Sequence, residues 1–321
     1  MRHYLAPMEG ITGCIFRNVY HSCFPPMDKY FTPFLSPNQN GKLSLKEYRD
    51  VEPGHNENMR VVPQILTNSA PDFIRTAKVL GDMGYDEVNL NLGCPSGTVV
   101  SKGRGAGFLA FPRQLDQCLY EIFSGLDMKI SVKTRLGKED PEEFEELLDI
   151  YNRYHMEELI IHPRVRKDMY RNMPRLDMFA KALERSLNPV CYNGDIFRKE
   201  DEERIRERFP GLGAVMLGRG IIAYPGLLEE HDEKLSSERL REFHDRLYQA
   251  NRQAYLAEAG QKVVLFKMKE IWCYLEWAFE DSRREAKRVK KAQTLGDYEA
   301  AVSAVFSTCR LIPGGGYRGT P

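Results

Sequence analysis

A cysteine follows directly on an apolar segment near residue 90, in the sequence Asn91-Leu92-Gly93-Cys94-Pro95. The alternating segment 87–92 predicts a buried strand that stops at Gly93, and Pro95 restricts the backbone just beyond it. Cys94 is therefore predicted at a strand terminus, close to Asn91 and shortly before the Gly-rich run 102–107. Such a thiol is placed for chemistry, but a small buried thiol that only packs is equally compatible with this position.

Residues suited to binding or catalysis also end other apolar segments of the chain. They are Ala6-Pro7-Met8, Gln64, Lys133 with Arg135, His162 with Arg164, Asn193-Gly194-Asp195 and Gly218-Arg219-Gly220. In a barrel of parallel strands, catalytic residues come from the C-terminal ends of several strands. Amide, thiol, amine and imidazole groups are therefore predicted to meet at one mouth of a barrel.

The segments that must position these residues alternate between two kinds. Short apolar segments, each ending in or directly followed by Gly, Pro or a polar residue, lie at 4–7, 29–33, 61–66, 87–92, 130–134, 159–162, 190–193 and 214–218. Stretches with helical spacing lie between most of them, at 72–83, 113–123, 141–154, 176–187 and 199–209. This alternation predicts parallel βα units, and residues 1–230 match the size of a (β/α)8 TIM barrel. The alternative, a doubly wound sheet, rarely needs so many regularly spaced strands.

The pattern changes after Tyr224-Pro225-Gly226. No strand is evident in the sequence from about 236 to 308, and helical spacing recurs at 238–256, 263–281 and 298–307. We therefore predict a small all-helical C-terminal domain at 236–310, appended to the barrel. The turn-rich sequence Pro313-Gly314-Gly315-Gly316-Tyr317 predicts a flexible tail at 311–321.

Composition argues against several classes of protein. The 321-residue chain has 46 Lys and Arg against 46 Asp and Glu. Its net charge is therefore zero and gives no overall electrostatic attraction to nucleic acid or membrane. Its 7 cysteines form no CxxC pair, which argues against a disulfide framework or a zinc module and fits a reducing cytosol. The sequence has neither an apolar leader nor a run long enough to cross a bilayer. We expect a soluble, cytoplasmic protein that acts as a monomer without a metal ion.

Two Gly-containing strand ends predict a phosphate site. TIM barrels often bind phosphate with the loops after strands seven and eight, where glycine amides approach the anion. Asn193-Gly194-Asp195 and Gly218-Arg219-Gly220 fall at these two positions, and Arg219 adds positive charge. Each motif alone is compatible with an ordinary tight turn, but their pairing at these strands favours phosphate binding.

Three strand-end side chains keep several interpretations open. Lys133 is compatible with a Schiff-base amine, with a fixed cation beside an electron-rich cofactor, or with a structural salt bridge. Gln64 offers both a donor and an acceptor, which suit the edge of a heterocyclic ring. His162 is compatible with an acid or base, with a phosphate ligand or with a core histidine. Single-residue reasoning does not separate these alternatives.

Basic residues are concentrated in one part of the predicted helical domain. They are Arg283, Arg284, Lys287, Arg288, Lys290 and Lys291. At helical spacing these side chains cover one broad face. That face is either a solvated surface or a contact with the phosphates of a nucleic acid.

The motifs of the barrel together resemble one family, the flavin-dependent tRNA-dihydrouridine synthases. The resemblance covers nearly the whole barrel and rests on Ala6-Pro7-Met8-Glu9-Gly10, Gln64, Asn91-Leu92-Gly93-Cys94-Pro95, Gly105-Ala106-Gly107, Val132-Lys133-Thr134-Arg135, His162, Arg164, Asn193-Gly194-Asp195-Ile196 and Gly218-Arg219-Gly220. The element from Asn91 to Pro95, with its Gly-rich sequel, is the most specific part. The helical region is similar to the RNA-binding domain of the family.

The resemblance implies a cofactor and a reaction. FMN, reduced by NADPH, would pass a hydride to C6 of a uridine in tRNA, and Cys94 would donate the proton to C5 as general acid. The product would be 5,6-dihydrouridine. A thiol in this role must stay protonated at neutral pH, which an ordinary cysteine pKa near 8.5 permits. The uracil must also leave its stack to reach the flavin.

The resemblance further implies roles for individual residues. Ala6, Pro7 and Met8 would line the flavin ring, while Gln64 and Lys133 would contact its polar edge, with Lys133 balancing the anion of reduced flavin. The FMN phosphate would be surrounded by His162, Asn193, Gly194, Asp195, Gly218 and Arg219. The substrate would contact Asn91, Arg135 and Arg164, and RNA phosphates would contact Arg283, Arg284, Lys287 and Arg288.

Two features depart from the family pattern. The family usually has His-Gly-Arg-Thr where this chain has His162-Pro163-Arg164-Val165, so Pro163 removes a backbone donor and Val165 removes a hydroxyl. Arg104 and Phe108 also occur in the Gly-rich loop. We expect these changes to affect recognition of the substrate more than recognition of the cofactor.

Other functions compete with this interpretation. A different FMN barrel oxidoreductase, acting on a small pyrimidine or enone, would share the phosphate site but would leave the basic helical region unexplained. A related reductase could act on ribosomal RNA. A degenerate barrel that binds RNA without turnover would hold no flavin, and a Schiff-base aldolase would use Lys133 without one.

Overall fold

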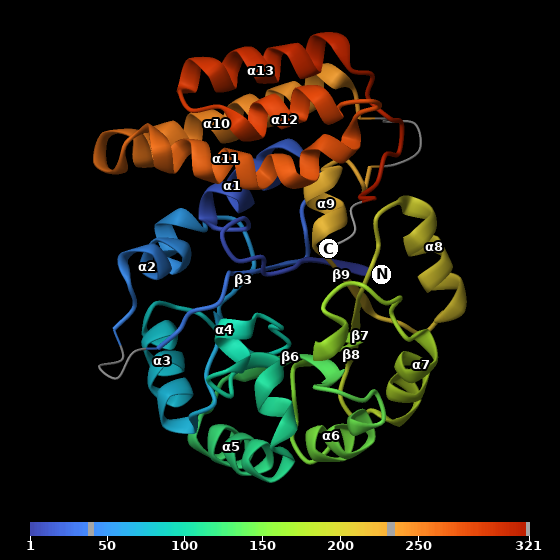
Figure 1. Cartoon of the computed structure of the whole chain (residues 1–321). Coiled ribbons are helices and arrows are strands. Elements are labelled where there is room, and N and C mark those ends of the chain that lie inside the picture. Colours follow the sequence, from blue (N-terminus) through green and yellow to red (C-terminus); the bar gives the residue numbers. More distant parts are fainter. Residues whose placement is uncertain (38–41, 230–234, 319–321) are drawn as a thin grey trace.

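Nine short parallel strands form the centre of the part of the molecule that the structure describes, residues 1–37, 42–229 and 235–318 (Figure 1). In this computed structural model the strands are β1 (Arg2–Leu5), β2 (Lys29–Phe31), β3 (Val61–Val62), β4 (Gln64–Ile65), β5 (Glu87–Leu92), β6 (Lys129–Gly137), β7 (Glu158–Val165), β8 (Val190–Asn193) and β9 (Ala214–Leu217). They pair in the order β3-β2-β1-β9-β8-β7-β6-β5-β4. The predicted TIM barrel is confirmed, and the strands are buried almost throughout, as expected for a parallel sheet covered on both faces.

The strands β3 and β4 are two halves of the predicted third strand, separated by Pro63. β3 pairs with β2 and β4 pairs with β5, so the two halves together close the sheet into a barrel. Proline has no backbone N–H to donate to a neighbouring strand, which explains the interruption. The Pro63 carbonyl still accepts a hydrogen bond from the Asn89 backbone N–H at 2.9 Å.

Helices surround the barrel (Figure 1). Five of them match the predicted helices within a few residues and are α3 (Ala70–Asp82), α5 (Pro112–Gly125), α6 (Glu143–Tyr151), α7 (Leu176–Arg185) and α8 (Lys199–Arg208). The other elements of this part are α1 (Cys14–Cys23), α2 (Leu45–Val51), α4 (Gly97–Val100), α9 (Arg219–Ala223) and the 3-10 turns Pro53–His55, Gly105–Ala110 and Arg166–Asp168. The long helices are amphipathic; α3, for example, buries Phe73, Ala77 and Leu80.

Charged side chains occupy the N-terminal end of the barrel. Lys29, at the start of β2, is buried, and its amine lies 2.8 Å from the Glu87 carboxylate and 3.8 Å from that of Glu158. Glu158 also accepts a hydrogen bond of 3.0 Å from the Tyr4 hydroxyl. Buried charges are tolerated only with partners of this kind. The opposite, C-terminal end of the strands is therefore the end left for a binding site.

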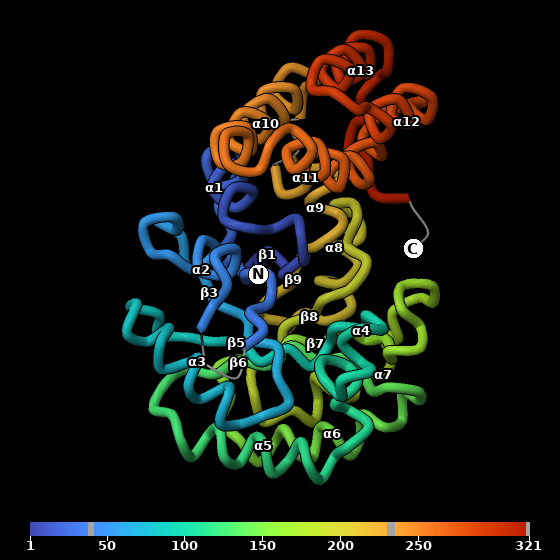
Figure 2. Tube along the Cα trace, turned by 60° about the vertical axis from the view of Figure 1, so that its left-hand side comes forward, coloured from blue at the N-terminus to red at the C-terminus, as the bar shows by residue number. Residues whose placement is uncertain are grey.

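Four further helices of the described residues form a layer on one side of the barrel (Figure 2). They are α10 (Ser237–Ala259), α11 (Gln261–Leu275), α12 (Arg283–Lys291) and α13 (Leu295–Thr308). α10 packs against α1, and α11 packs against α9. The segment predicted to be helical to residue 281 ends earlier, at Leu275, and the 3-10 turn Glu276–Ala278 leads on toward α12. In the described ranges, no helix combines the length and the apolar character needed to cross a membrane.

Residues 311–318 contact both parts of the molecule. They belong to the tail predicted to be flexible at 311–321, of which 319–321 lie outside the described residues. Leu311 forms an antiparallel bridge with Phe279, and the Ile312 N–H donates to the Ala278 carbonyl at 2.8 Å. The Gly314 N–H donates to the Tyr224 hydroxyl, which follows α9 of the barrel, at 3.2 Å. Backbone hydrogen bonds and buried glycines thus fix a course for this segment that its composition alone does not indicate.

Candidate active site

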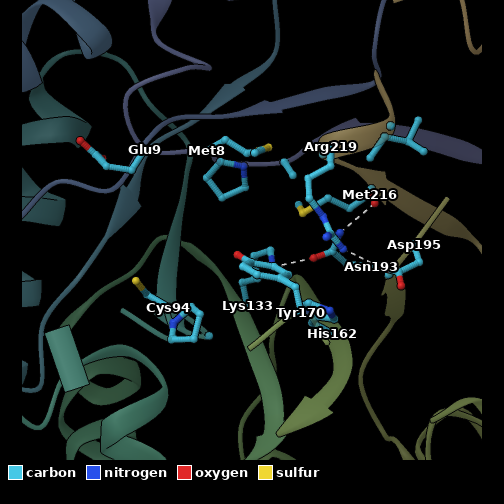
Figure 3. A pocket seen from close by; sticks show the side chains of 18 of the residues that line it. Met8, Glu9, Cys94, Lys133, His162, Tyr170, Asn193, Asp195, Met216 and Arg219 are labelled. Atoms are coloured by element: carbon cyan, nitrogen blue, oxygen red, sulfur yellow. Dashed lines mark hydrogen bonds and ion pairs between the residues drawn. The ribbon is translucent and has the colours of Figure 1, made fainter. Parts of the chain in front are cut away.

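A cavity of about 310 Å³ lies at the C-terminal ends of the barrel strands (Figure 3). Most of the strand-end residues predicted from the sequence line it, namely Ala6, Pro7, Met8, Gln64, Asn91, Cys94, Lys133, Arg135, His162, Asn193, Gly194, Asp195, Gly218 and Arg219. In Figure 3, Cys94 lies on the opposite side of the cavity from Arg219 and Asp195. The cavity therefore has a thiol end and a cationic end.

The asparagine before the thiol fixes the turn that carries it. The side-chain oxygen of Asn91 accepts hydrogen bonds from the backbone N–H groups of Gly93 at 3.1 Å and Cys94 at 2.9 Å. Its side-chain nitrogen donates to the Gln64 amide oxygen at 2.7 Å, and Gln64 in turn donates to Asn89 at 2.8 Å. A chain of buried amides therefore connects neighbouring strands to the position of Cys94.

The Gly-rich run supports the same turn from the other side. A Cβ atom on Gly105 would lie 2.8 Å from the Cys94 carbonyl oxygen, and one on Gly107 would lie 2.7 Å from the Val100 carbonyl oxygen. Gly105 also has a φ of 55°, which side chains other than glycine rarely adopt. The Ala106 N–H donates to the Cys94 carbonyl at 3.0 Å. Only glycine fits this close approach, which accounts for the Gly-rich sequel to the cysteine motif.

Burial raises the pKa of the Cys94 thiol, although Arg135 and Lys133 partly oppose this effect. Its raised pKa keeps the thiol protonated at neutral pH. Cys94 is nevertheless only half-buried and lines the cavity. A raised pKa suits a thiol that keeps its proton better than it suits a nucleophilic cysteine, which needs a lowered pKa.

Lys133 projects from β6 into the centre of the cavity (Figure 3). Its amine donates to the Asn193 side-chain oxygen at 2.7 Å, and the Asn193 side-chain nitrogen donates to the Met216 carbonyl at 2.9 Å. Burial, with the nearby charge of Arg135 adding to it, lowers the pKa of Lys133 to about 8. The amine is therefore positively charged at neutral pH and is held at a defined point. The hydrogen bond that holds it goes to an amide oxygen rather than to a carboxylate.

A buried ion pair builds the cationic end. Arg164, on β7, is 1% exposed and pairs through both terminal nitrogens with the Asp195 carboxylate. Asp195 also accepts a hydrogen bond of 2.6 Å from Arg219. Its φ of 29° is unusual for a residue with a side chain, and strain of this kind is maintained when surrounding contacts fix it. Because two arginines share one carboxylate, the cluster keeps a net positive charge that can attract an anion.

His162, at the cationic end of the cavity, is neutral. Burial and the surrounding cations Arg135, Lys133, Arg164 and Arg219 lower the pKa of His162 well below its usual range. Arg164 has only donors, so its contact of 2.9 Å with His162 Nε2 makes that nitrogen the acceptor. The proton is therefore on Nδ1, and His162 is a hydrogen-bond donor rather than an acid or base near pH 7.

Gly220 lets the loops after β8 and β9 approach one another, and Gly194 lies close to a side chain of its own strand. A Cβ on Gly220 would lie 2.1 Å from the Ile196 carbonyl oxygen, so a side chain is excluded there. A Cβ on Gly194 would lie 2.9 Å from the Tyr192 hydroxyl. The loops after β8 and β9 are consequently in backbone contact, as the paired Gly motifs of the sequence suggest.

Some predicted residues have other partners than expected. Arg135, predicted to contact substrate, directs donors to the carbonyl oxygens of Gly93 at 2.9 Å, Val165 at 3.0 Å and Met169 at 2.8 Å, and so supports the loops around the thiol. Arg164, also predicted to contact substrate, is absent from the described cavity lining because its side chain lies against Asp195 and His162. The amide of Asn91, predicted to position uracil, is engaged with the Cys94 turn.

The Asp168 carboxylate organises the backbone near Pro163 and Val165, where the sequence departs from the family pattern. The Val165 N–H donates to Asp168 at 3.0 Å, and Asn172 and Arg175 donate to the same carboxylate. The Pro163 carbonyl accepts from the Arg175 N–H at 2.7 Å. Asp168 thereby organises the loop after β7.

Several aromatic residues of the cavity were not predicted. Tyr170, which follows β7, lies over Arg219 with 4.5 Å between guanidinium carbon and ring centre. Phe34 follows β2, and Tyr274 comes from α11 of the helical layer. Tyr170 and Phe34 come from loops that follow barrel strands, whereas Tyr274 comes from a segment distant from the catalytic motifs. Tyr274 shows that the helical layer contributes to the cavity itself.

The basic residues of α12 lie on its solvent side. Arg283, Arg284, Lys287 and Arg288 are exposed, while Ala286 and Val289 face inward. Arg284, Lys287 and Arg288, together with Lys291, line an open groove of about 490 Å³ between α12 and α13. Arg283 is not part of the groove lining, and Lys290 turns away to contact Glu276 at 2.8 Å.

The lining fits a planar, anionic cofactor. The apolar strand end Ala6-Pro7-Met8 provides one wall, and Met216 adds to it. Lys133, the His162 Nδ1–H and Arg219 supply donors and positive charge, and Gly218 lies against the apolar wall, where a Cβ would be 3.3 Å from the Met8 Sδ. This combination suits a heterocyclic ring system that carries a phosphate.

Comparison with a family model and with curated relatives identifies the family of this chain. Residues 4–307 match the family model described as dihydrouridine synthase. A protein of Staphylococcus epidermidis named "Probable tRNA-dihydrouridine synthase" is 29% identical over 251 residues, covering 74% of this chain and 73% of the relative. "Probable tRNA-dihydrouridine synthase 2" of Bacillus subtilis is 28% identical and covers 74% of each chain. A solved structure of morphinone reductase, at 12% identity and a TM-score of 0.49, covers 71% of this chain and 85% of its own.

The protein is thus a flavin-dependent oxidoreductase built on a TIM barrel. Within that class, the chain belongs to the dihydrouridine synthase family. The family resemblance inferred from the motifs of the barrel is confirmed, and so is the enzymatic character expected from it.

Proposed function

We propose that this protein reduces uridines of tRNA to 5,6-dihydrouridine, with FMN as its flavin and NADPH as the source of electrons. The observation that carries the proposal is that a protonated thiol, Cys94, lines the same cavity as the cationic end formed by Arg219, His162 and Lys133. The names of the relatives from Staphylococcus epidermidis and Bacillus subtilis support tRNA as the substrate.

The residues of the cavity suggest how FMN is held. Ala6, Pro7 and Met8 would line the ring, and Lys133 would lie at its polar edge with Gln64 behind it. The phosphate would be bound by Arg219, by the Nδ1–H of His162 and by the backbone of Gly194 and Gly218, which leaves Asn193 and Asp195 to orient Lys133 and Arg219. When bound and reduced, the flavin supplies a hydride to C6 of uracil.

Cys94 would complete the reduction as general acid. Its Sγ holds a proton and delivers it to C5 of uracil, so that hydride and proton together saturate the C5–C6 bond. The thiolate that remains takes a proton back from water. Asn91, Gly105 and Arg135 do not react, but they set the position of the thiol through the Cys94 turn and its neighbouring loops.

The groove between α12 and α13 would bind the RNA. Target uridines must be extruded from their stack to reach a cavity at the strand ends, which requires the RNA to be held elsewhere on the protein. Exposed Arg284, Lys287 and Arg288 are suited to phosphates, and Arg283 extends the same helix face. We assign this role to the helical domain 236–310.

Replacing Cys94 with alanine should abolish most uridine reduction while FMN stays bound. The expected loss in rate is roughly 100- to 10,000-fold, the usual contribution of a general acid. The measurement is dihydrouridine formed in tRNA per flavin, by mass spectrometry, alongside the flavin absorbance of the variant. Cys118→Ala, a buried cysteine of α5, is the control. Unchanged turnover by Cys94→Ala would refute the assignment.

Raising the pH from 7 to 9 should weaken FMN binding to the flavin-free chain. The pKa of Lys133 is about 8, so its charge is present below that pH and is lost above it, together with its attraction for an anionic ligand. A decrease of up to about tenfold is expected, since one pKa unit corresponds to a tenfold change. Flavin fluorescence titrations measure it. Lys133→Met should bind more weakly at pH 7 and show no such decrease; an identical pH profile for both proteins would exclude Lys133.

Reversing two charges on α12 should weaken RNA binding without affecting the flavin site. For Arg284→Glu/Arg288→Glu, the slope of log affinity against log salt should decrease by about 2, because each phosphate contact contributes about 0.9. Filter binding of tRNA at several salt concentrations measures this, and NADPH oxidation should be unchanged. The matched control is Lys78→Glu/Arg113→Glu, on exposed positions of α3 and α5. Equal effects of both pairs would make the α12 face an ordinary solvated surface.

A further inference from the structure

The 311–318 segment brings an aromatic ring to the cationic end of the cavity. The ring of Tyr317 lies 5.3 Å from the Arg219 guanidinium carbon. It also contacts Phe197, which follows β8, at 5.3 Å between centres, and Tyr274 of α11 at 5.6 Å. A residue from beyond the last helix thus lies beside the arginine that we assign to the FMN phosphate.

Arg219 is enclosed by three rings that come from separate parts of the chain. Besides Tyr317, the guanidinium carbon lies 4.5 Å from the ring centre of Tyr170 and 5.1 Å from that of Phe197. One of its terminal nitrogens, Nη2, donates to Asp195. Aromatic faces attract a guanidinium group and exclude water from it, so they limit its rotamers and strengthen its charge.

The position of the segment depends on close packing at one glycine. Gly316 is buried, and a Cβ on it would lie 2.6 Å from the Phe197 carbonyl oxygen and 2.7 Å from the Arg198 Cγ. The segment is also held by hydrogen bonds to Ala278 and Tyr224. The Gly-rich sequence permits backbone contact with the loop that follows β8.

We propose that Tyr317 is a positioning residue of the cofactor site, which fixes Arg219 for recognition of the FMN phosphate. This inference rests on the proposed function, because it takes FMN to be the flavin and Arg219 to be its phosphate ligand. Tyr317 acts only through the guanidinium group. Its removal therefore affects binding of a flavin that carries a phosphate and leaves binding of the flavin ring unaffected.

Riboflavin, which has the ring but not the phosphate, provides the test. The full chain is freed of flavin and titrated with FMN and with riboflavin, following flavin fluorescence. Tyr317→Ala should bind FMN roughly 5- to 30-fold more weakly than the wild type, the range expected for loss of one cation–π contact. Its affinity for riboflavin should stay within about twofold. Tyr317→Phe keeps the ring and should bind both flavins as the wild type does.

Two further variants separate positioning from a general loss of structure. Gly316→Val should displace the segment and give the same selective loss of FMN affinity as Tyr317→Ala. Tyr120→Ala, which removes an exposed tyrosine of α5, is the matched control and should change neither affinity. In a protein with Arg219→Met, the additional change Tyr317→Ala should have no further effect on FMN, because the group it positions is absent.

Three results would contradict this inference. Tyr317→Ala with wild-type affinity for FMN would show that the ring does not act on the phosphate ligand. Equal losses for FMN and riboflavin would show a purely structural role. An additive effect of Tyr317→Ala in the Arg219→Met protein would show that it acts elsewhere. If the wild-type protein bound neither flavin, the proposed function itself would be overturned. If the wild type bound FMN and Tyr317→Ala bound it equally well, only this inference would be overturned.

Discussion

The ion pair between Arg164 and Asp195 is the interaction on which the geometry of the site depends. Arg164 is buried, so its charge requires the Asp195 carboxylate, and breaking such a pair costs about 3–5 kcal/mol. The same two groups also position their neighbours, since Asp195 accepts from Arg219 and Arg164 donates to His162. These contacts link the loops that follow β7, β8 and β9.

This arrangement separates two chemical functions within one cavity. The cationic end has a neutral histidine donor and the Arg219 guanidinium, which suit a phosphate. At the other end, burial raises the pKa of Cys94, and close backbone contact with Gly105 fixes its turn. Lys133 lies between the two ends with its charge directed by Asn193. A flavin that spans the cavity would have an anion site at one end and a proton donor at the other.

Much of the barrel and of the cavity lining could be predicted, because the ends of the strands can be recognised in the sequence. The barrel strands were located from alternating apolar residues that stop at Gly or Pro. Residues at the ends of these strands, such as Cys94 and Lys133, line the cavity as expected. The partners of buried polar groups were not predictable, since hydrogen bonds such as those of Arg135 to Gly93 and Val165 depend on tertiary distances. Tyr274 and Tyr317 lie far along the chain from the motifs, so no local pattern could assign them to the site.

The central claim is tested most directly by incubating the purified protein with FMN, NADPH and unmodified tRNA, and mapping the RNA by mass spectrometry. The account predicts dihydrouridine at defined uridines of the tRNA, together with oxidation of NADPH. If tRNA gains no dihydrouridine while the same flavin-loaded protein uses NADPH to reduce a small enone or modifies only ribosomal RNA, the account of its substrate is contradicted.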